Sequence, residues 1–461
     1  MGALAACLVL ILLLMRARGI WLDEATSLWL TRHDVSFADS FFGRWATDVH
    51  PPLFSLYAWT LEPLLGGSVR SMRLVNLGGL LFAAITAIQA WRRGGDRDFL
   101  FLFAVMVAGS PFFVLYAAEF RSYFLQLVLS ACLIVQLRLV HEGRAAWPML
   151  ALTALLLTNL HYMGSLIGLI LIGAEAIHLF RTGRGRAAMA LLLIAAGAAL
   201  PLALALWLML RAIDPVAVND ISALRSLMAI GAVSMSAVLP YVAALGFLPR
   251  ISAPEEERRS FLCVLTRALA AIMLGYALLN LATHNLLPRH MIAAVPIGAS
   301  ILALLLEDLV KANRIAFALI CANAVLLAGA GTAYGLTHKR WETNVPLIER
   351  TRAACLGTQL YALNPMSLLG RNDPLHGVPD IGQFFATTYR LIMPDAVILP
   401  DGRVILPQGR CPALLWIEHH YARTDLDDAE LARIAGFGGA IRIVRLQRGD
   451  ARALLAIYPA Q

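Results

Sequence analysis

The sequence predicts an all-α polytopic membrane protein that carries a small α/β domain at its C-terminal end. Of the 461 residues, 59% are hydrophobic and 15% are charged, whereas soluble globular domains hold about 25% charged residues. Several windows before residue 337 reach the roughly 20 apolar residues that a membrane-spanning helix needs. From residue 337 onward the chain becomes polar and shows short alternating apolar runs, which are typical of β-strands.

About eleven spanning helices are predicted, because backbone groups inside lipid must bond within their own segment. The first span is short. Arg16 and Arg18 follow it and no basic residue precedes it, so we interpret it as a span and not as a cleaved signal peptide. The predicted spans are 1–14, 69–91, 99–116, 123–141, 147–163, 164–182, 187–211, 225–249, 262–283, 290–307 and 314–336.

The loops between these spans alternate in charge. Basic loops occur at 92–97, 144, 181–186, 250–259 and 311–314. The positive-inside rule places such loops in the cytoplasm, so the net charge of +8 reflects topology and gives no sign of nucleic-acid binding. The opposite loops lie at 19–68, 117–122, 159–163, 212–224 and 284–289. We expect them, and the C-terminal domain, to face the periplasm of a bacterial inner membrane, although Arg16 and Arg18 depart from the rule.

The first outer loop, 19–68, is acidic and begins with the pair Asp23-Glu24. Asp23 is the candidate general base, because a positioned carboxylate raises the rate of a proton-transfer step by about 10²–10⁴. A carboxylate that caps a helix is the alternative. Glu24 is predicted to bind the acceptor or to share a metal with Asp23, or else to be a solvated neighbour. The loop holds six carboxylates against two arginines, namely Asp23, Glu24, Asp34, Asp39, Asp48 and Glu62 against Arg32 and Arg44.

The same loop contains the run Asp48-Val49-His50-Pro51-Pro52. Asp48 and His50 are expected to form a hydrogen-bonded pair that lines a substrate cavity, with the two prolines making the loop rigid. A plain turn from loop to helix is the alternative. The apolar stretch 51–65 is too short to span a membrane and is predicted to be an interfacial helix with proline in its first turn.

Further polar residues stand where later outer loops meet spans: Glu119, Arg121, Tyr123, His161 and Arg289. Arginine is always charged and binds phosphate oxygens in a bidentate manner, so Arg121 and Arg289 are predicted to hold phosphate, with Glu119 orienting Arg121. His161 is predicted to contact phosphate or sugar. Membrane-interface anchoring is the alternative for the arginines and for Tyr123.

No charged residue lies at the middle of a predicted span. The charged residues Glu175, Arg267 and Glu307 all fall near the cytoplasmic ends of their spans. A charge at a helix centre costs about 2.5–3.5 kcal/mol on insertion scales, so it is kept where a carrier uses it. The pattern therefore disfavours a proton-coupled transporter and favours chemistry at the outer surface.

The region 337–461 is predicted to be an α/β domain. Its predicted strands are 359–362, 396–399, 404–406, 414–418, 441–446 and 454–458, and its predicted helices are 346–354 and 427–434. Cys355 and Cys411 both lie in this region. In an oxidising periplasm they could form a disulfide, although their spacing alone does not show that they meet.

These motifs together resemble the GT-C membrane glycosyltransferases, most of all the branch of protein O-mannosyltransferases and aminoarabinose transferases. The resemblance covers about residues 1–310. It rests on Asp23-Glu24, Asp48 to Leu53, Glu119 to Tyr123, His161-Tyr162 and Arg289-His290 in this order. One departure is that the loop after Asp23 has no lysine, which aminoarabinose transferases use to hold the lipid phosphate.

The resemblance implies a catalytic transmembrane domain at 1–336 and a variable outer domain at 337–461. It also implies a sugar donor on polyprenyl phosphate, an acceptor at the outer face that is a protein, lipid or glycan, and inversion at the anomeric carbon. Whether a divalent ion takes part is open, since Asp23, Glu24 and Asp48 offer enough oxygen ligands for one.

Two other functions remain open. A lipid-linked polysaccharide ligase or polymerase also works at the outer face, but it commonly uses arginine and histidine in a large late loop, whereas here the large loop comes first and is acidic. A transporter or flippase for a lipid-linked glycan would show paired midplane charges or mirrored broken helices. The sequence shows neither.

Overall fold

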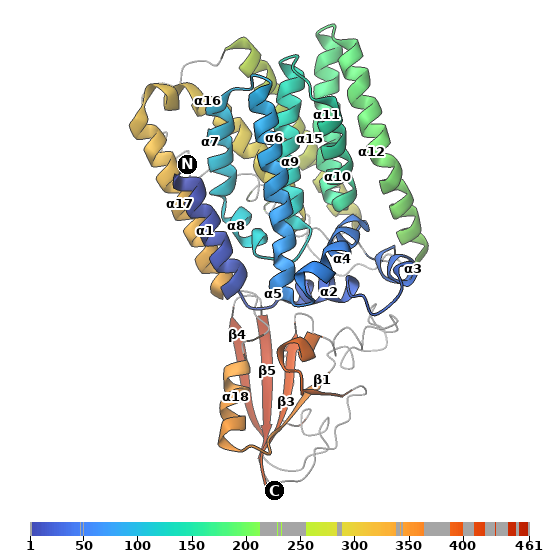
Figure 1. The fold of residues 1–461 in the computed structure, drawn as a ribbon, viewed down its shortest axis with the longest axis vertical. Coiled ribbons are helices and arrows are strands. Elements are labelled where there is room, and N and C mark those ends of the chain that lie inside the picture. The colour runs from blue at the N-terminus through green and yellow to red at the C-terminus, as the bar shows by residue number, and fades with distance from the viewer. Residues whose placement is uncertain are drawn as a thin grey trace. The chain divides into compact units, whose positions relative to one another are not determined.

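The computed structural model describes residues 2–46, 48, 50–212, 228, 232, 255–283, 288–337, 342, 344–363, 388–399, 410–419, 429, 441–448 and 451–459. The chain divides into two compact units (Figure 1). The first unit comprises Met1–Arg16, Leu30–Gly66 and Ser71–Thr332, and the second comprises Ala17–Trp29, Gly67–Arg70 and Ala333–Gln461. The second unit thus contains two short N-terminal segments in addition to the C-terminal region.

The first unit is a bundle of apolar helices. Its longer helices are α1 (Gly2–Ala17), α6 (Leu77–Arg92), α7 (Arg97–Ala108), α9 (Tyr123–His141), α10 (Trp147–Leu160), α11 (Tyr162–Arg181), α12 (Gly185–Ala212), α15 (Glu256–Thr283), α16 (Val295–Ala312) and α17 (Arg314–Thr337). Shorter elements lie between α1 and α6, namely α3 (Phe37–Asp39), η1 (Ser40–Trp45), α4 (Leu53–Leu65), α5 (Val69–Met72) and η2 (Arg73–Asn76); α5 is shared with the second unit. α8 (Pro111–Ala117) follows α7, and η3 (Pro288–Ala294) precedes α16.

Most of the predicted spans are helices in the structure. Within the described residues, seven helices are long and apolar enough to cross a membrane, an eighth span is a bent pair, and α1 and α10 are shorter apolar helices. The chain is therefore a multi-pass membrane protein. The predicted span 225–249 lies outside the described residues except for Met228 and Ala232, and 51–65 forms helix α4 after Pro52.

Two predicted spans have breaks that hydropathy did not indicate. The predicted span 99–116 is the pair α7 and α8, bent by 67°. The bend comes at Gly109-Ser110-Pro111, because a proline within a helix removes a hydrogen bond and clashes with the preceding turn. The boundary predicted between 163 and 164 is instead at His161, whose backbone is extended.

Helix α9 forms the centre of the first unit. All of its side chains except Ala131 are buried, as expected of a helix that is apolar on every face. Glycines let two neighbours approach it closely: a Cβ on Gly79 of α6 would lie 2.8 Å from Leu125, and one on Gly164 of α11 would lie 2.8 Å from Gln126. The tight packing fixes both ends of α9.

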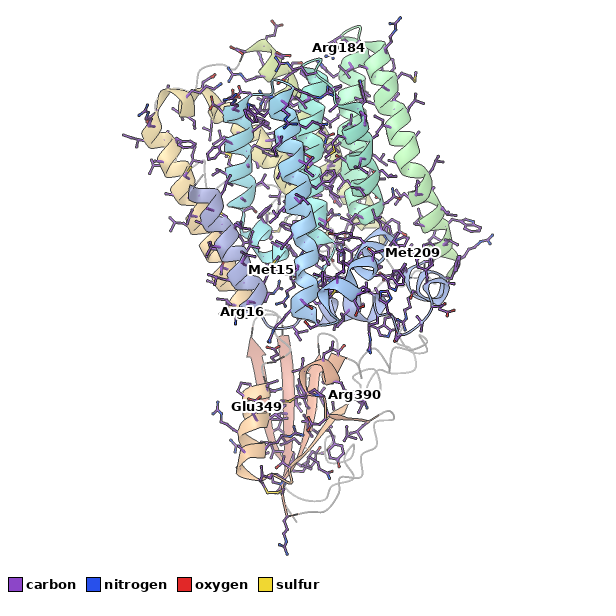
Figure 2. All side chains as sticks on the ribbon, viewed as in Figure 1. Met15, Arg16, Arg184, Met209, Glu349 and Arg390 are labelled. Atoms are coloured by element: carbon purple, nitrogen blue, oxygen red, sulfur yellow. A yellow bond between two sulfur atoms is a disulfide. The ribbon has the colours of Figure 1, made fainter. Side chains whose placement is uncertain are left out.

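The C-terminal end of α9 is held by ion pairs. Arg138 donates to Glu142 at 2.8 Å and its guanidinium lies 4.0 Å from the centre of the Phe99 ring. On the neighbouring helices, Lys311 lies 2.7 Å from Glu307 and 3.1 Å from Asp96. Arg184, labelled in Figure 2 at the turn between α11 and α12, donates to the Val140 carbonyl at 2.7 Å. The N-terminal end of α9, in contrast, carries the candidate site.

The second unit contains a mixed five-stranded sheet in the order β2-β1-β3-β5-β4. β1 (Gln359–Leu363) pairs in parallel with β2 (Val397–Leu399) and β3 (Ala413–His419), whereas β5 (Ala451–Tyr458) is antiparallel to β3 and to β4 (Arg442–Arg448). The predicted helix 346–354 is α18 (Val345–Ala354). The predicted strand 404–406 and helix 427–434 lie outside the described residues, except for Ala429.

One face of this sheet packs a core that includes an N-terminal residue. Trp21 is buried there with Ile348 of α18, Tyr389, and Trp416 of β3. Trp21 directly precedes α2 (Leu22–Leu30), the helix that carries Asp23 and Glu24, so most of α2 belongs to the second unit. Cys355 and Cys411, whose pairing the sequence left open, form a disulfide with their Cα atoms 5.7 Å apart.

Candidate active site

Asp48 and His50 lie close together immediately before α4, as an ion pair and without the predicted hydrogen bond. The Asp48 carboxylate oxygen Oδ2 lies 3.4 Å from His50 Nδ1, and both side chains are mostly buried. The imidazole of His50 meets that of His161 edge to face, with ring centres 4.8 Å apart. The loop before α4 is thereby brought to the break between α10 and α11, about a hundred residues later in the chain.

The loop between α8 and α9 carries Glu119 and Arg121. Glu119 is fully buried. The Arg121 guanidinium lies 5.9 Å from the centre of the Tyr123 ring, within the distance at which a cation is attracted by an aromatic face. Tyr123 is the first residue of α9 and is buried, so its ring forms a floor beneath the guanidinium.

Asn76 holds this loop in place. Its side chain is fully buried, and its amide nitrogen Nδ2 donates to the carbonyl oxygens of Ala117 at 3.0 Å and Glu119 at 2.8 Å, with a longer contact of 3.4 Å to Tyr116. These carbonyls lie in the last turn of α8 and just beyond it, and the Ala117 carbonyl has no further helical turn to supply its donor. Sequence reasoning missed Asn76. The available signal was an amide near the start of the predicted span 69–91, close to Arg70 and Arg73.

His161 occupies the break between α10 and α11. Its backbone is extended (φ −164°, ψ 135°), and its Nδ1 accepts a hydrogen bond from the Met163 backbone N–H at 3.1 Å, which caps α11. The ring centre lies 5.6 Å from that of Tyr123 and 5.7 Å from that of His290. His161 therefore lies at the centre of a group of aromatic and basic side chains.

Arg289 and His290 reach the same group from η3. The Tyr276 hydroxyl, on α15, is 3.3 Å from the His290 carbonyl oxygen and 3.4 Å from that of Met163, which joins η3 to the start of α11. Burial lowers the pKa of His161 well below its ordinary value, and the nearby charges of His50, His290, Arg121 and Arg289 lower it further. The charges of both predicted phosphate-binding arginines thus lower the pKa of the same imidazole.

Asp23 and Glu24 lie in the second unit, in the first turn of α2. The Glu24 carboxylate is fully buried and accepts a hydrogen bond from the Trp21 backbone N–H at 3.1 Å, so Glu24 caps the helix. Asp23 follows the start of α2 at Leu22, and its side chain is partly exposed. The sequence suggested a capping role for Asp23, and Glu24 makes a capping hydrogen bond in the same turn.

The structure brings together, in the first unit, the predicted residues Asp48, His50, Arg121, Tyr123, His161 and Arg289, with Glu119 in the same loop as Arg121. Among the described residues, no three His, Cys, Asp or Glu side chains gather in a way that could hold a metal ion. The suggested set of Asp23, Glu24 and Asp48 is also divided between the two units. We derive no step that uses a metal.

Comparison with known proteins identifies the fold. No family model matches the sequence, and no curated protein matches it. Among solved structures, the chain is similar to ArnT from Cupriavidus metallidurans bound to undecaprenyl phosphate, at 15% identity and a TM-score of 0.53, covering 98% of this chain and 97% of that one. ArnT from the same organism in the apo state gives 14% identity and a TM-score of 0.50, covering 99% and 97%. The predicted GT-C-like fold is confirmed.

Proposed function

We propose that the chain is a glycosyltransferase that transfers a sugar from a polyprenyl-phosphate donor to a protein, lipid or glycan at the outer face of the bacterial inner membrane. One observation carries the proposal: His50, Arg121, His161 and Arg289 come from four separate segments and meet within one GT-C-like unit. Two guanidinium groups beside imidazoles form a site for an anion, and phosphate is the anion that arginine binds best.

The donor fits this site on chemical grounds. The ArnT structure that resembles this chain holds undecaprenyl phosphate, a lipid with one phosphate headgroup. Nucleotide sugars are confined to the cytoplasm, so a sugar used outside must arrive already attached to a lipid carrier. The predicted topology and the Cys355–Cys411 disulfide support an outward-facing site, because disulfides persist in oxidising compartments.

The reaction is a displacement at the anomeric carbon. An acceptor hydroxyl oxygen forms a bond to the sugar C1 while the bond from C1 to the phosphate oxygen breaks, and the configuration inverts. The step also needs a base that takes the proton from the acceptor hydroxyl, and the sequence makes the Asp23 carboxylate the candidate for it. The leaving phosphate keeps the bonding electrons, and Arg121 and Arg289 stabilise its added charge, an effect typically worth about 10²–10³ in rate per group. Glu24 takes no proton in this scheme, because its carboxylate is buried and engaged in capping.

The test replaces Asp23 by asparagine in a strain that lacks the chromosomal copy. Envelope glycans are compared by mass spectrometry with those of the wild type, so the sugar need not be known beforehand. We expect Asp23→Asn to lose transfer by about 10²–10⁴-fold at normal expression, since the base is removed and the shape is kept. Asp34→Asn is the matched control, because Asp34 is another acidic side chain of the same sequence region that pairs with Arg44 at 2.7 Å near the surface.

Restored glycans with Asp23→Asn would remove Asp23 from the mechanism. A parallel series tests the phosphate site. Arg289→Ala should raise the KM for the donor or lower kcat, and Arg289→Lys should recover only part of the loss, because lysine keeps the charge but lacks the bidentate fork. Wild-type kinetics in both variants would assign the phosphate to other residues.

A further inference from the structure

His161 is distinctive because its two ring nitrogens have opposite surroundings. Nδ1 accepts the Met163 N–H at 3.1 Å. Nε2 is fully buried, and among the described residues no acceptor lies within hydrogen-bonding distance of it. The residue as a whole is 5% exposed. A buried donor without a partner costs free energy, so such a group needs a water, an ion or a ligand as its partner.

The capping hydrogen bond determines where the proton of the ring lies. A nitrogen that accepts a hydrogen bond carries no proton, and a charged imidazolium carries a proton on both nitrogens. His161 is therefore neutral, with its single proton on Nε2. Because Nδ1 is occupied by the start of α11, the ring cannot exchange tautomers without breaking the cap.

The surroundings of Nε2 select the missing partner. The side chains whose charges act on His161 are His50 before α4, Arg121 before α9, and Arg289 and His290 on η3. Tyr123 of α9 also faces the ring. The groups around the ring are thus basic or aromatic. Two carboxylates lie among the same segments: Asp48 is 3.4 Å from His50, and Glu119 is buried in the loop that carries Arg121. An N–H donor in such surroundings suits an anionic oxygen.

We propose that His161 binds the phosphate of the lipid-linked donor as a permanently neutral hydrogen-bond donor, through Nε2–H, in addition to capping α11 through Nδ1. This inference rests on the proposed function and adds a specific role to it. The arginines supply charge, whereas His161 supplies a donor of fixed direction. Since His161 carries no charge, the strength of its contribution does not change as pH falls through the usual range of histidine titration.

Two substitutions separate the two nitrogens. In His161→Asn, the amide oxygen can take the place of Nδ1 and cap α11, since asparagine is among the preferred capping residues, but no atom reaches the position of Nε2. In His161→Gln, the longer side chain places an amide N–H near the position of Nε2, and the cap is lost. Each variant therefore retains one function and removes the other.

The experiment measures equilibrium binding of a polyprenyl phosphate to the full-length protein in detergent, together with the melting temperature of each variant. We expect His161→Asn to melt like the wild type and to bind about 10-fold or more weakly. We expect His161→Gln to melt several degrees lower and to bind within about threefold of the wild type. The ratio of wild-type affinity to His161→Asn affinity should stay constant from about pH 5.5 to 8.

Opposite results overturn the inference. If His161→Asn binds normally and His161→Gln binds weakly, His161 only caps. If the affinity ratio rises at low pH, His161 acts as a cation. Binding of inorganic phosphate but not polyprenyl phosphate would exclude the lipid-linked ligand. If the wild type binds no polyprenyl phosphate at all, the proposed function fails as well. If substitutions of Arg121 and Arg289 weaken binding but His161→Asn does not, only the role of His161 is overturned.

Discussion

Asp23 and Glu24 are adjacent in the sequence, but the fold gives them different surroundings. Glu24 is buried and bonded to the Trp21 N–H, while Asp23 is partly exposed in the same turn. The sequence could identify the acidic pair, because two carboxylates beside a membrane span are conspicuous. It could not decide which of them caps, because that depends on whether α2 begins at residue 22 or at residue 25.

Capping by Glu24 leads to a prediction at this scale. Glu24→Gln should keep stability and transfer close to those of the wild type, because a glutamine carbonyl can still accept the Trp21 N–H. Glu24→Ala should lower the melting temperature by a few degrees, since loss of a capping side chain costs about 0.5–2 kcal/mol. Thermal unfolding in detergent and the glycan assay measure both. Loss of transfer in a stable Glu24→Gln protein would show that the carboxylate itself takes part in the reaction.

At the scale of elements, the breaks between helices position the candidate site. Arg121 lies between α8 and α9, His161 between α10 and α11, and Arg289 in the 3₁₀ turn before α16. Each break leaves backbone groups without helical partners, and polar side chains satisfy some of them. The residues that could act on a substrate are thus concentrated at the ends of helices, where the backbone already requires polar neighbours.

The positioning role of Asn76 can be tested by substitution. Asn76→Ala removes the side-chain donor of the Ala117 carbonyl, at a cost of about 1–3 kcal/mol, while the Tyr116 and Glu119 carbonyls keep backbone donors. It also releases the loop that carries Arg121. We expect a lower melting temperature and a several-fold higher KM for the donor. Gln136→Leu is the matched control: Gln136 is a buried amide that donates to Thr153 at 3.1 Å, about 20 Å along α9 from Tyr123 at 1.5 Å per residue.

The control should lower stability without changing the KM. An equal rise in KM for both variants would mean that Asn76 acts only through general stability of the bundle.

The role of Asn76 also shows what hydropathy can and cannot predict. Apolar windows predicted the helices because burial in lipid requires a minimum length. They did not predict Asn76, the bend at Pro111 or the break at His161, because these depend on which backbone groups meet in three dimensions.

At the scale of the whole molecule, the chain joins a membrane-spanning bundle to a β-sheet unit that also includes α2. The sequence predicted both parts from composition, since apolar windows stop near residue 337 and alternating runs follow. It did not predict that Trp21 would be part of the core of the sheet unit. A single tryptophan shows no periodicity, so only the tertiary contacts reveal where it packs.

The disulfide offers a test of which side of the membrane the C-terminal unit faces. Cys355 and Cys411 are 56 residues apart, and closing a loop of that length restricts the unfolded chain by about 4 kcal/mol in the entropic account. If the C-terminal unit faces an oxidising periplasm, both thiols should resist alkylation in intact cells and become reactive after reduction. A gel-shift assay with a maleimide reagent measures this, with the double variant Cys355→Ser/Cys411→Ser as the blank. Thiols that react without reduction would place the C-terminal unit in the cytoplasm, and the catalytic scheme, which needs a lipid-linked sugar at the outer face, would then have the wrong topology.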